Sequence, residues 1–195
     1  MISEKTHNSI LIVTSSNKIQ SFLSDALPPY TFAPIDTVLT CLDAKRLLLT
    51  SEYDIIIINA PLSDERGDAL ALDLVSRTSS SIILLMGEKN FAELSPMLET
   101  NGVVCLSKPI NQSLLSSSVR LAAAMRARLK IAEKKAQRLE NREDELRVVN
   151  HAKWVLISNL GMSESDAHKY IEKQAMDMRM PKKEVAANII KTYEN

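Results

Sequence analysis

The feature that most constrains the fold is a run of four isoleucines, Ile55–Ile58, in the stretch YDIIIINA. A strand that is apolar on both faces must be covered on both faces, which is typical of a parallel sheet between two helical layers. Similar short runs (SILIVT, SIILLMG, GVVCLSKP) and a weaker extended stretch, YTFAPID, alternate with segments of helical periodicity over residues 1–113. Five strands alternating with five helices predict an α/β domain with a doubly wound, five-stranded parallel sheet.

The charge distribution divides the chain into two halves. Residues 1–113 carry 8 Lys and Arg against 13 Asp and Glu, whereas residues 114–195 carry 16 against 11, so the net charge of zero is a cancellation. An acidic half followed by a basic half favours two functional units, of which the second is the better partner for a polyanion. With 45% hydrophobic residues in 195, the chain can bury a real core.

Several classes of protein are disfavoured by what the sequence lacks. Its apolar runs are too short to span a bilayer, and its N-terminus has no signal-peptide pattern, so we expect a cytoplasmic protein without membrane contact. Cys41 and Cys105 lie in apolar patterns and are expected to be core thiols. No Cys/His cluster has ligand spacing and no nucleophile–base pair is evident, so we expect no metal, no cofactor and no catalytic residue.

After residue 114 the strand patterns stop and a heptad repeat begins. No glycine or proline interrupts residues 119–160, and one stripe recurs at spacings of three and four from Ala122 to Asn150, with Glu143 as a second polar member. This spacing predicts a coiled coil between two copies. The interface positions would be Met125, Leu129, Ala132, Ala136, Leu139 and Leu146. The alternative is a single helix that packs this stripe on its own chain.

The C-terminal tail has the signals of a small three-helix unit. Gly161 is suited to end the long helix, Ser163 with Asp166 resembles a capping box, and Pro181 suits the first turn of a third helix. The expected shared core consists of Leu156, Leu160, Ile171, Val185, Ile189 and Ile190.

The order of elements and the LSKP motif at 106–109 resemble a two-component receiver domain over residues 9 to about 125. The resemblance implies a flavodoxin-like fold whose carboxylates bind Mg²⁺ and whose strand-three aspartate accepts a phosphoryl group. Gly67, eight residues after Asn59, fits the family register, which places Asn59 at the phosphoacceptor position. The positions of that pocket hold Thr14, Ser15, Asn59, Met86 and Lys108.

Of these residues, only Lys108 agrees with the phosphorylating pattern. Thr14 and Ser15 replace the acidic pair and carry no charge for Mg²⁺, Met86 replaces a hydroxyl, and the amide of Asn59 is a poor nucleophile. We therefore interpret the domain as a pseudo-receiver that is not phosphorylated at residue 59. Lys108 is expected to cap the strand edge or to hydrogen-bond Asn59.

Residues 152–190, AKWVLISNLGMSESDAHKYIEKQAMDMRMPKKEVAANII, are similar to the ANTAR output domain of transcription antitermination regulators. The resemblance implies a dimeric regulator that binds paired hairpin loops in leader RNA and so prevents a terminator from forming. It also implies a pseudo-receiver over 1–118, a coiled-coil linker over 119–146 and an ANTAR domain over 147–195.

The tail contains residue types that such recognition needs. Five cations, Lys153, Lys169, Arg179, Lys182 and Lys183, could contact phosphates, and Tyr170 or His168 could stack on a splayed base. Other interpretations stay open at this level. Tyr170 and Trp154 could equally pack in the bundle, and Lys182 and Lys183 could simply form a solvated face.

The sequence thus predicts an RNA-binding antiterminator controlled by a partner protein, a small ligand or dimerisation instead of phosphate. The alternative is an interaction module whose pseudo-receiver binds a sensor protein, with little RNA binding. A DNA-binding role is disfavoured because no helix-turn-helix pattern is clear, and an enzyme is disfavoured more strongly.

Overall fold

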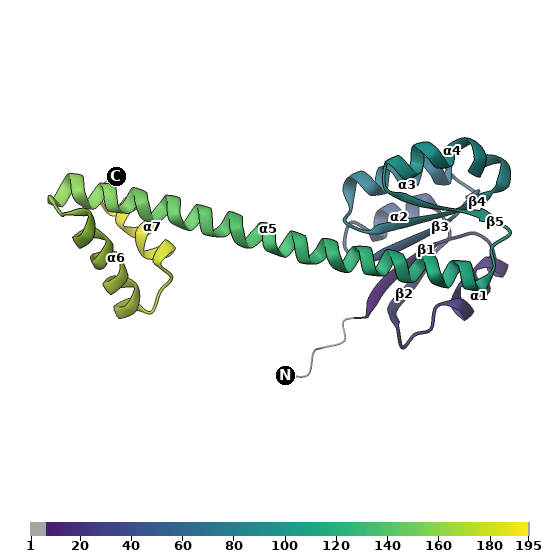
Figure 1. The fold of residues 1–195 in the computed structure, drawn as a ribbon, viewed down its shortest axis with the longest axis horizontal. Helices are drawn as coiled ribbons and strands as arrows, with labels where there is room; N and C mark the ends of the chain where they lie inside the picture. The colour runs from purple at the N-terminus through teal and green to yellow at the C-terminus, as the bar shows by residue number, and fades with distance from the viewer. Residues whose placement is uncertain (1–6, 195) are drawn as a thin grey trace. The chain divides into compact units, whose positions relative to one another are not determined.

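The computed structural model describes residues 7–194 and divides into two compact units after residue 130. Unit 1 contains a parallel five-stranded sheet in the order β2-β1-β3-β4-β5 (Figure 1). Its strands are β1 (Asn8–Val13), β2 (Phe32–Val38), β3 (Ile55–Asn59), β4 (Ser81–Gly87) and β5 (Val103–Lys108). The predicted doubly wound sheet is confirmed, and the four isoleucines form its central strand.

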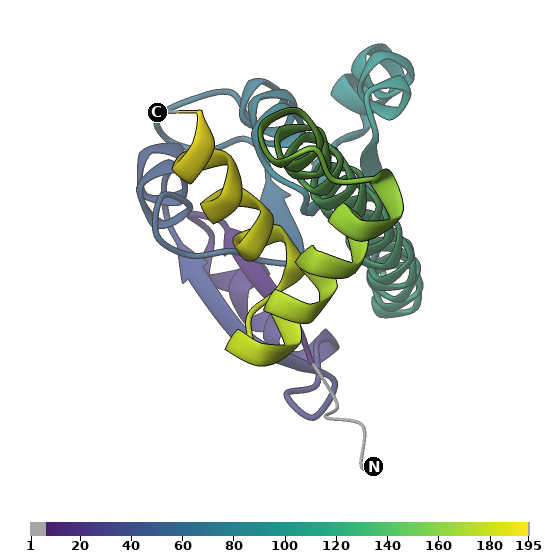
Figure 2. The same cartoon turned by 90° about the vertical axis from the view of Figure 1, so that its left-hand side faces the viewer.

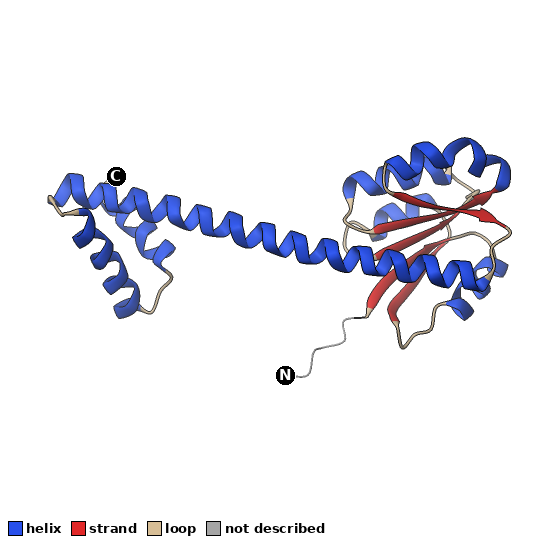
Figure 3. Ribbon diagram, in the orientation of Figure 1, coloured by secondary structure: helices blue, strands red, loops and turns tan. Residues whose placement is uncertain are grey.

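Helices cover both faces of this sheet (Figure 3). Helices α2 (Cys41–Leu47), α3 (Gly67–Arg77) and α4 (Glu88–Thr100) pack on one face, and α1 (Asn17–Ala26) with the beginning of α5 (Gln112–Leu160) packs on the other. Because side chains alternate along a strand, Ile56 and Ile58 face the first layer, whereas Ile55 and Ile57 face the second. All four are fully buried, as a two-sided apolar strand requires.

Unit 2 is formed by the later part of α5 with α6 (Glu164–Met178) and α7 (Lys182–Tyr193), which lie side by side (Figure 2). Gly161 ends α5 in the left-handed conformation with φ of +66°, and the Ser163 side chain accepts a hydrogen bond from the Asp166 amide at the start of α6. Both predicted helix ends are confirmed. Helix α7 begins at Lys182, so Pro181 is its N-cap residue and does not lie in its first turn as predicted.

The core of unit 2 differs from the predicted one at its end. Its buried members are Val149, Ala152, Val155, Leu156, Ala167, Ile171, Ala175, Val185, Ala186 and Ile189, with Ile190 partly buried against them. The prediction for Leu160 is wrong, since its side chain is 47% exposed. Leu160 is the last residue of α5, and α6 packs against the preceding turns instead.

No helix among residues 7–194 is both long and apolar enough to cross a membrane.

Candidate functional site

The phosphoacceptor position of the receiver pattern lies at the carboxyl edge of the sheet. Asn59 ends β3 and Thr14 follows β1, and the parallel pairing of these strands places the two side chains together. Asn59 Nδ2 donates to Thr14 Oγ1 at 3.0 Å, and the same oxygen accepts from the Ser16 amide at 3.1 Å. Both side chains are buried. Thus a neutral hydrogen-bonded pair occupies the place where the resemblance would require carboxylates.

The remaining pocket positions surround this pair without adding reactive groups. Met86 is buried in the core at the end of β4, and Ser15 is exposed. Lys108 Nζ donates to the carbonyl oxygen of Ala60, so it holds the strand edge and not the Asn59 side chain. Burial lowers the pKa of Lys108.

The donors at this edge do not fit Mg²⁺. The pocket positions supply two hydroxyls, an amide, a thioether and an ammonium, whereas Mg²⁺ is held by carboxylates and phosphate oxygens. The carboxylate of Asp64, in the loop after β3, accepts hydrogen bonds from the amides of Cys41 and Leu42 at 3.0 and 3.1 Å. These bonds lower the pKa of Asp64 and use its oxygens to cap α2. No phosphoryl-transfer step can therefore be derived from these residues.

Gly67 keeps the loop after β3 close to the strand. A Cβ atom at this position would lie 2.8 Å from the Cβ of Ala60, which is closer than side-chain carbons approach one another. The glycine found eight residues after Asn59 is therefore required in this chain for a steric reason.

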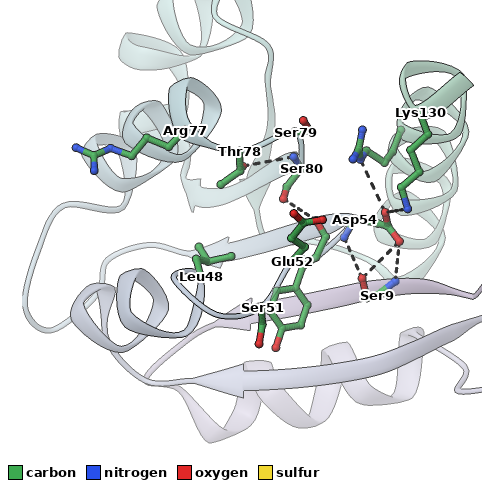
Figure 4. Close-up of a pocket in the computed structure, with 12 residues that line it drawn as sticks. Ser9, Leu48, Ser51, Glu52, Asp54, Arg77, Thr78, Ser79, Ser80 and Lys130 are labelled. Carbon is green, nitrogen blue, oxygen red and sulfur yellow. Dashed lines mark hydrogen bonds and ion pairs between the residues drawn. The ribbon is translucent and has the colours of Figure 1, made fainter. Parts of the chain in front are cut away.

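A polar cavity of about 340 Å³ lies at the opposite edge of the sheet (Figure 4). Asp54, which precedes β3, accepts from the Ser9 amide at 3.1 Å and from Ser9 Oγ at 3.4 Å. Its carboxylate also pairs with Lys130 Nζ and lies 3.8 Å from Arg126 Nε, so it joins the sheet to α5. Sequence reasoning missed this cluster, although a single acid at the start of an otherwise apolar strand was a usable signal.

The predicted RNA-contacting residues are only partly brought together in unit 2. Arg179 ends α6 in the left-handed conformation, and Lys182 and Lys183 begin α7 directly after it, so these three cations share one corner. Lys153 pairs with Glu164 at 3.1 Å, at the other end of α6. At 1.5 Å per residue, α6 separates it from the corner by about 22 Å. Tyr170 is 37% exposed between them.

Two of the corner cations are already paired with carboxylates. Lys182 contacts Glu172 and Lys183 contacts Asp144, each at 2.5 Å. Hydrogen bonds from these lysines lower the pKa values of both carboxyls. These surface pairs are weak and exchange readily for another anion. Arg179 makes no ion pair within residues 7–194, so its guanidinium is the most available of the three.

The heptad stripe of α5 is largely exposed. Ala122 packs in the core of unit 1, but Met125, Leu129, Leu139 and Leu146 are each more than half exposed, and Ala132 and Ala136 are exposed as well. None of these six predicted interface residues belongs to a buried cluster of either unit. Within the described residues, therefore, the stripe is not covered by its own unit.

Comparison with known proteins agrees with this two-part organisation. Residues 137–190 match the ANTAR domain family. The Transcriptional regulatory protein PdtaR of Mycobacterium tuberculosis, in strains CDC 1551 / Oshkosh and H37Rv, is 26% identical over 150 residues, covering 77% of this chain and 73% of the relative.

Several solved structures that are similar to the chain are signal receiver domains. The signal receiver domain of a putative Luxo repressor protein from Vibrio parahaemolyticus has a TM-score of 0.59 at 24% identity, covering 65% of this chain and 98% of that one. The signal receiver domain of an HD domain-containing protein from Pseudomonas fluorescens Pf-5 has a TM-score of 0.58 at 24% identity, covering 64% and 92%. At this identity the likeness establishes the fold. The chain therefore contains an ANTAR domain that follows a receiver-fold domain, which is the organisation of an ANTAR response regulator.

Proposed function

We propose that this regulator binds hairpin loops in leader RNA as a homodimer and thereby prevents transcription termination, under a control that does not use aspartyl phosphorylation. The ANTAR match over residues 137–190 is the single observation that carries this proposal. We assign the pseudo-receiver to 1–118, the coiled-coil linker to 119–146 and the ANTAR domain to 147–195, in a cytoplasmic protein.

The cationic corner of unit 2 is the best surface for the RNA backbone. Arg179, Lys182 and Lys183 lie within five residues of one another where α6 meets α7, and phosphate oxygens can displace the exposed carboxylates that now pair with the two lysines. Tyr170 offers a partly exposed ring for a splayed base. Lys153 is a weaker candidate, since its side chain is only 16% exposed and is paired with Glu164.

Dimerisation gives this modest surface enough affinity. Residues 146–195 carry 8 Lys and Arg against 6 Asp and Glu, so one copy attracts RNA only weakly. When two copies are joined through the exposed stripe of α5, the second hairpin binds as an intramolecular step, which raises affinity by about 10²–10⁴.

The neutral Asn59–Thr14 pair supports control without phosphate. An amide hydrogen-bonded to a buried hydroxyl offers neither a nucleophile nor a metal site. The input would be a partner protein, the dimer equilibrium, or a small ligand in the cavity beside Asp54. Incubation with acetyl phosphate and Mg²⁺ should leave the intact mass of the protein unchanged. An acid-labile gain of one phosphoryl group would disprove control without phosphorylation.

A gel shift tests the proposed RNA binding. Purified protein should shift a leader RNA with two hairpins and lose that shift when both loop sequences are scrambled with the stems intact. Arg179→Ala should weaken the shift, whereas the matched exposed-cation control Arg77→Ala in unit 1 should not. No shift at micromolar protein and moderate salt would contradict the proposal.

The second candidate is an interaction module that binds a sensor protein through the pseudo-receiver. One observation favours it: Lys153, Lys182 and Lys183 are all neutralised by carboxylates of their own unit, which reduces attraction for RNA. Capture of a sensor domain by a chain that shifts none of the hairpin RNAs would select this function.

A further inference from the structure

We infer that the contact with a second copy continues past Asn150 into the ANTAR domain, along the face of α5 that carries Leu146, Trp154, Ile157 and Leu160. This inference rests on the proposed dimer and extends it. The sequence predicted that Leu160 would be buried in the core of the three-helix unit. Because it is exposed, this surface is available as an interface.

Helix α5 has two apolar faces in unit 2. Val149, Ala152 and Leu156 point into the core with α6 and α7. At 100° per residue, the face around Leu146, Asn150 and Ile157 lies about 105° away from them. The second face is therefore distinct from the first, on which the α6–α7 pair of the same copy packs.

The second face is open. Trp154 is 62% exposed, Leu146 54%, Leu160 47% and Ile157 36%, and none of them belongs to the buried cluster of the unit. Single exposed apolar side chains are ordinary, but these recur at spacings of three and four from Leu146 through Asn150 to Leu160 and so form one patch. A continuous patch of this kind, containing an indole, marks an interaction surface.

The heptad register identifies the partner as a second copy in parallel orientation. Glu143, Asn150 and Ile157 continue the same position as Leu129 and Ala136, and an asparagine at that position is the usual specifier of a parallel two-stranded pair.

The flanking charges agree with this register. Lys135 and Glu140 occupy the positions before and after the seam that face each other between parallel copies, and their charges are opposite. Arg142 and Arg147 have like charges at the next such pair, although Arg147 is already paired with Asp144 at 2.8 Å.

The arrangement leaves the RNA-contacting corners uncovered. Because the contact face is distinct from the face that packs on α6 and α7, joining two copies through it keeps each α6–α7 pair outside the seam. The dimer would then present two cationic corners, one for each hairpin.

The only tryptophan of the chain, Trp154, reports this contact directly. We expect its emission maximum to move to shorter wavelength as the full-length protein is concentrated through the dimerisation range measured by analytical ultracentrifugation. Addition of the two-hairpin RNA to preformed dimer should leave this maximum unchanged. Quenching by RNA without a shift on dimerisation would show that Trp154 is instead a stacking platform for bases, and would overturn the inference.

Substitutions separate this inference from the proposed function. Ile157→Glu should raise the dimer dissociation constant by about tenfold or more, because like charges would face each other across the seam. Met176→Glu, at an exposed methionine on α6, is the matched control and should leave dimerisation unchanged. Circular dichroism should show native helix content in both variants.

Each outcome has a distinct meaning. A wild-type dimer that is unaffected by Ile157→Glu and shows no Trp154 shift would place the end of the seam before Asn150, which refutes the extension and leaves the proposed dimer intact. A wild-type chain that stays monomeric with RNA bound would refute the dimer itself.

Discussion

The stripe of α5 in unit 1 yields the sharpest prediction for function. We expect the double substitution Met125→Glu and Leu129→Glu to abolish dimerisation and to weaken RNA binding together. The two side chains are 58% and 51% exposed and lie outside both cores, so the substitution should leave the fold of each unit intact.

The expected magnitude follows from the exposed area. Complete burial of such a side chain stabilises by about 1.5–3 kcal/mol, so covering the exposed half of four side chains in a dimer contributes about 3–6 kcal/mol. Each 1.4 kcal/mol is a factor of ten, and the dissociation constant should therefore rise by about 10²–10⁴. RNA affinity should fall by at least about 10², because two hairpins then bind independently.

Sedimentation velocity across a concentration series measures the first effect, and a gel shift with two-hairpin RNA measures the second. Ile131→Glu is the matched control, since Ile131 is 69% exposed on the same helix but lies outside the stripe. A monomeric double variant that retains wild-type RNA affinity would refute the reasoning that joins the dimer to RNA binding.

Three further predictions concern stability and reactivity. Gly67→Ala should destabilise unit 1 by about 1–3 kcal/mol in denaturant unfolding followed by amide exchange of β3, because the added methyl overlaps Ala60; unchanged exchange would contradict the steric argument. Burial raises the pKa of Cys41 to about 12 and that of Cys105 to about 11, so neither thiol should react with a disulfide reagent at pH 8 until denaturant is added, when both should. Hydrogen bonds from Lys183 and Arg147 lower the pKa of Asp144, so its stabilising contribution is present above the unfolded pKa of about 3.9 and is lost as the pH falls through the lower, folded value. Unfolding followed by Trp154 emission should therefore lose less stability between pH 6 and pH 3 in Asp144→Asn than in the wild type, and equal losses would show that the pair contributes nothing.

The fold was predictable because its signals are local. The isoleucine run of β3, the alternation with helical periodicity, and the caps at Gly161 and Ser163 each depend on a few neighbouring residues. The exposure of Leu160 was not predictable in this way. Helical periodicity shows that a helix has an apolar face, but it does not show which of two apolar faces the rest of the unit covers. Helix α5 has one covered and one exposed apolar face in unit 2.

The candidate sites show the same limit. The residues at the phosphoacceptor position were identified from the receiver resemblance, but the bond from Lys108 to Ala60 and the bond from Asn59 to Thr14 depend on side-chain positions that spacing does not determine. Asp54 is about 70 residues away from Arg126 and Lys130 in the sequence and meets them only because α5 passes the end of β3 where Asp54 lies. Long-range ion pairs of this kind leave no periodic signal.

The neutral Asn59–Thr14 pair has a consequence for the energetics of the whole receiver-fold domain. Several carboxylates at one strand edge repel one another, and a domain that contains them is most stable when a divalent cation is bound. Here a single hydrogen bond between uncharged groups replaces that repulsion. The thermal stability of unit 1 should accordingly be the same in chelator and in millimolar magnesium, and the resting conformation of this edge needs no ion to maintain it.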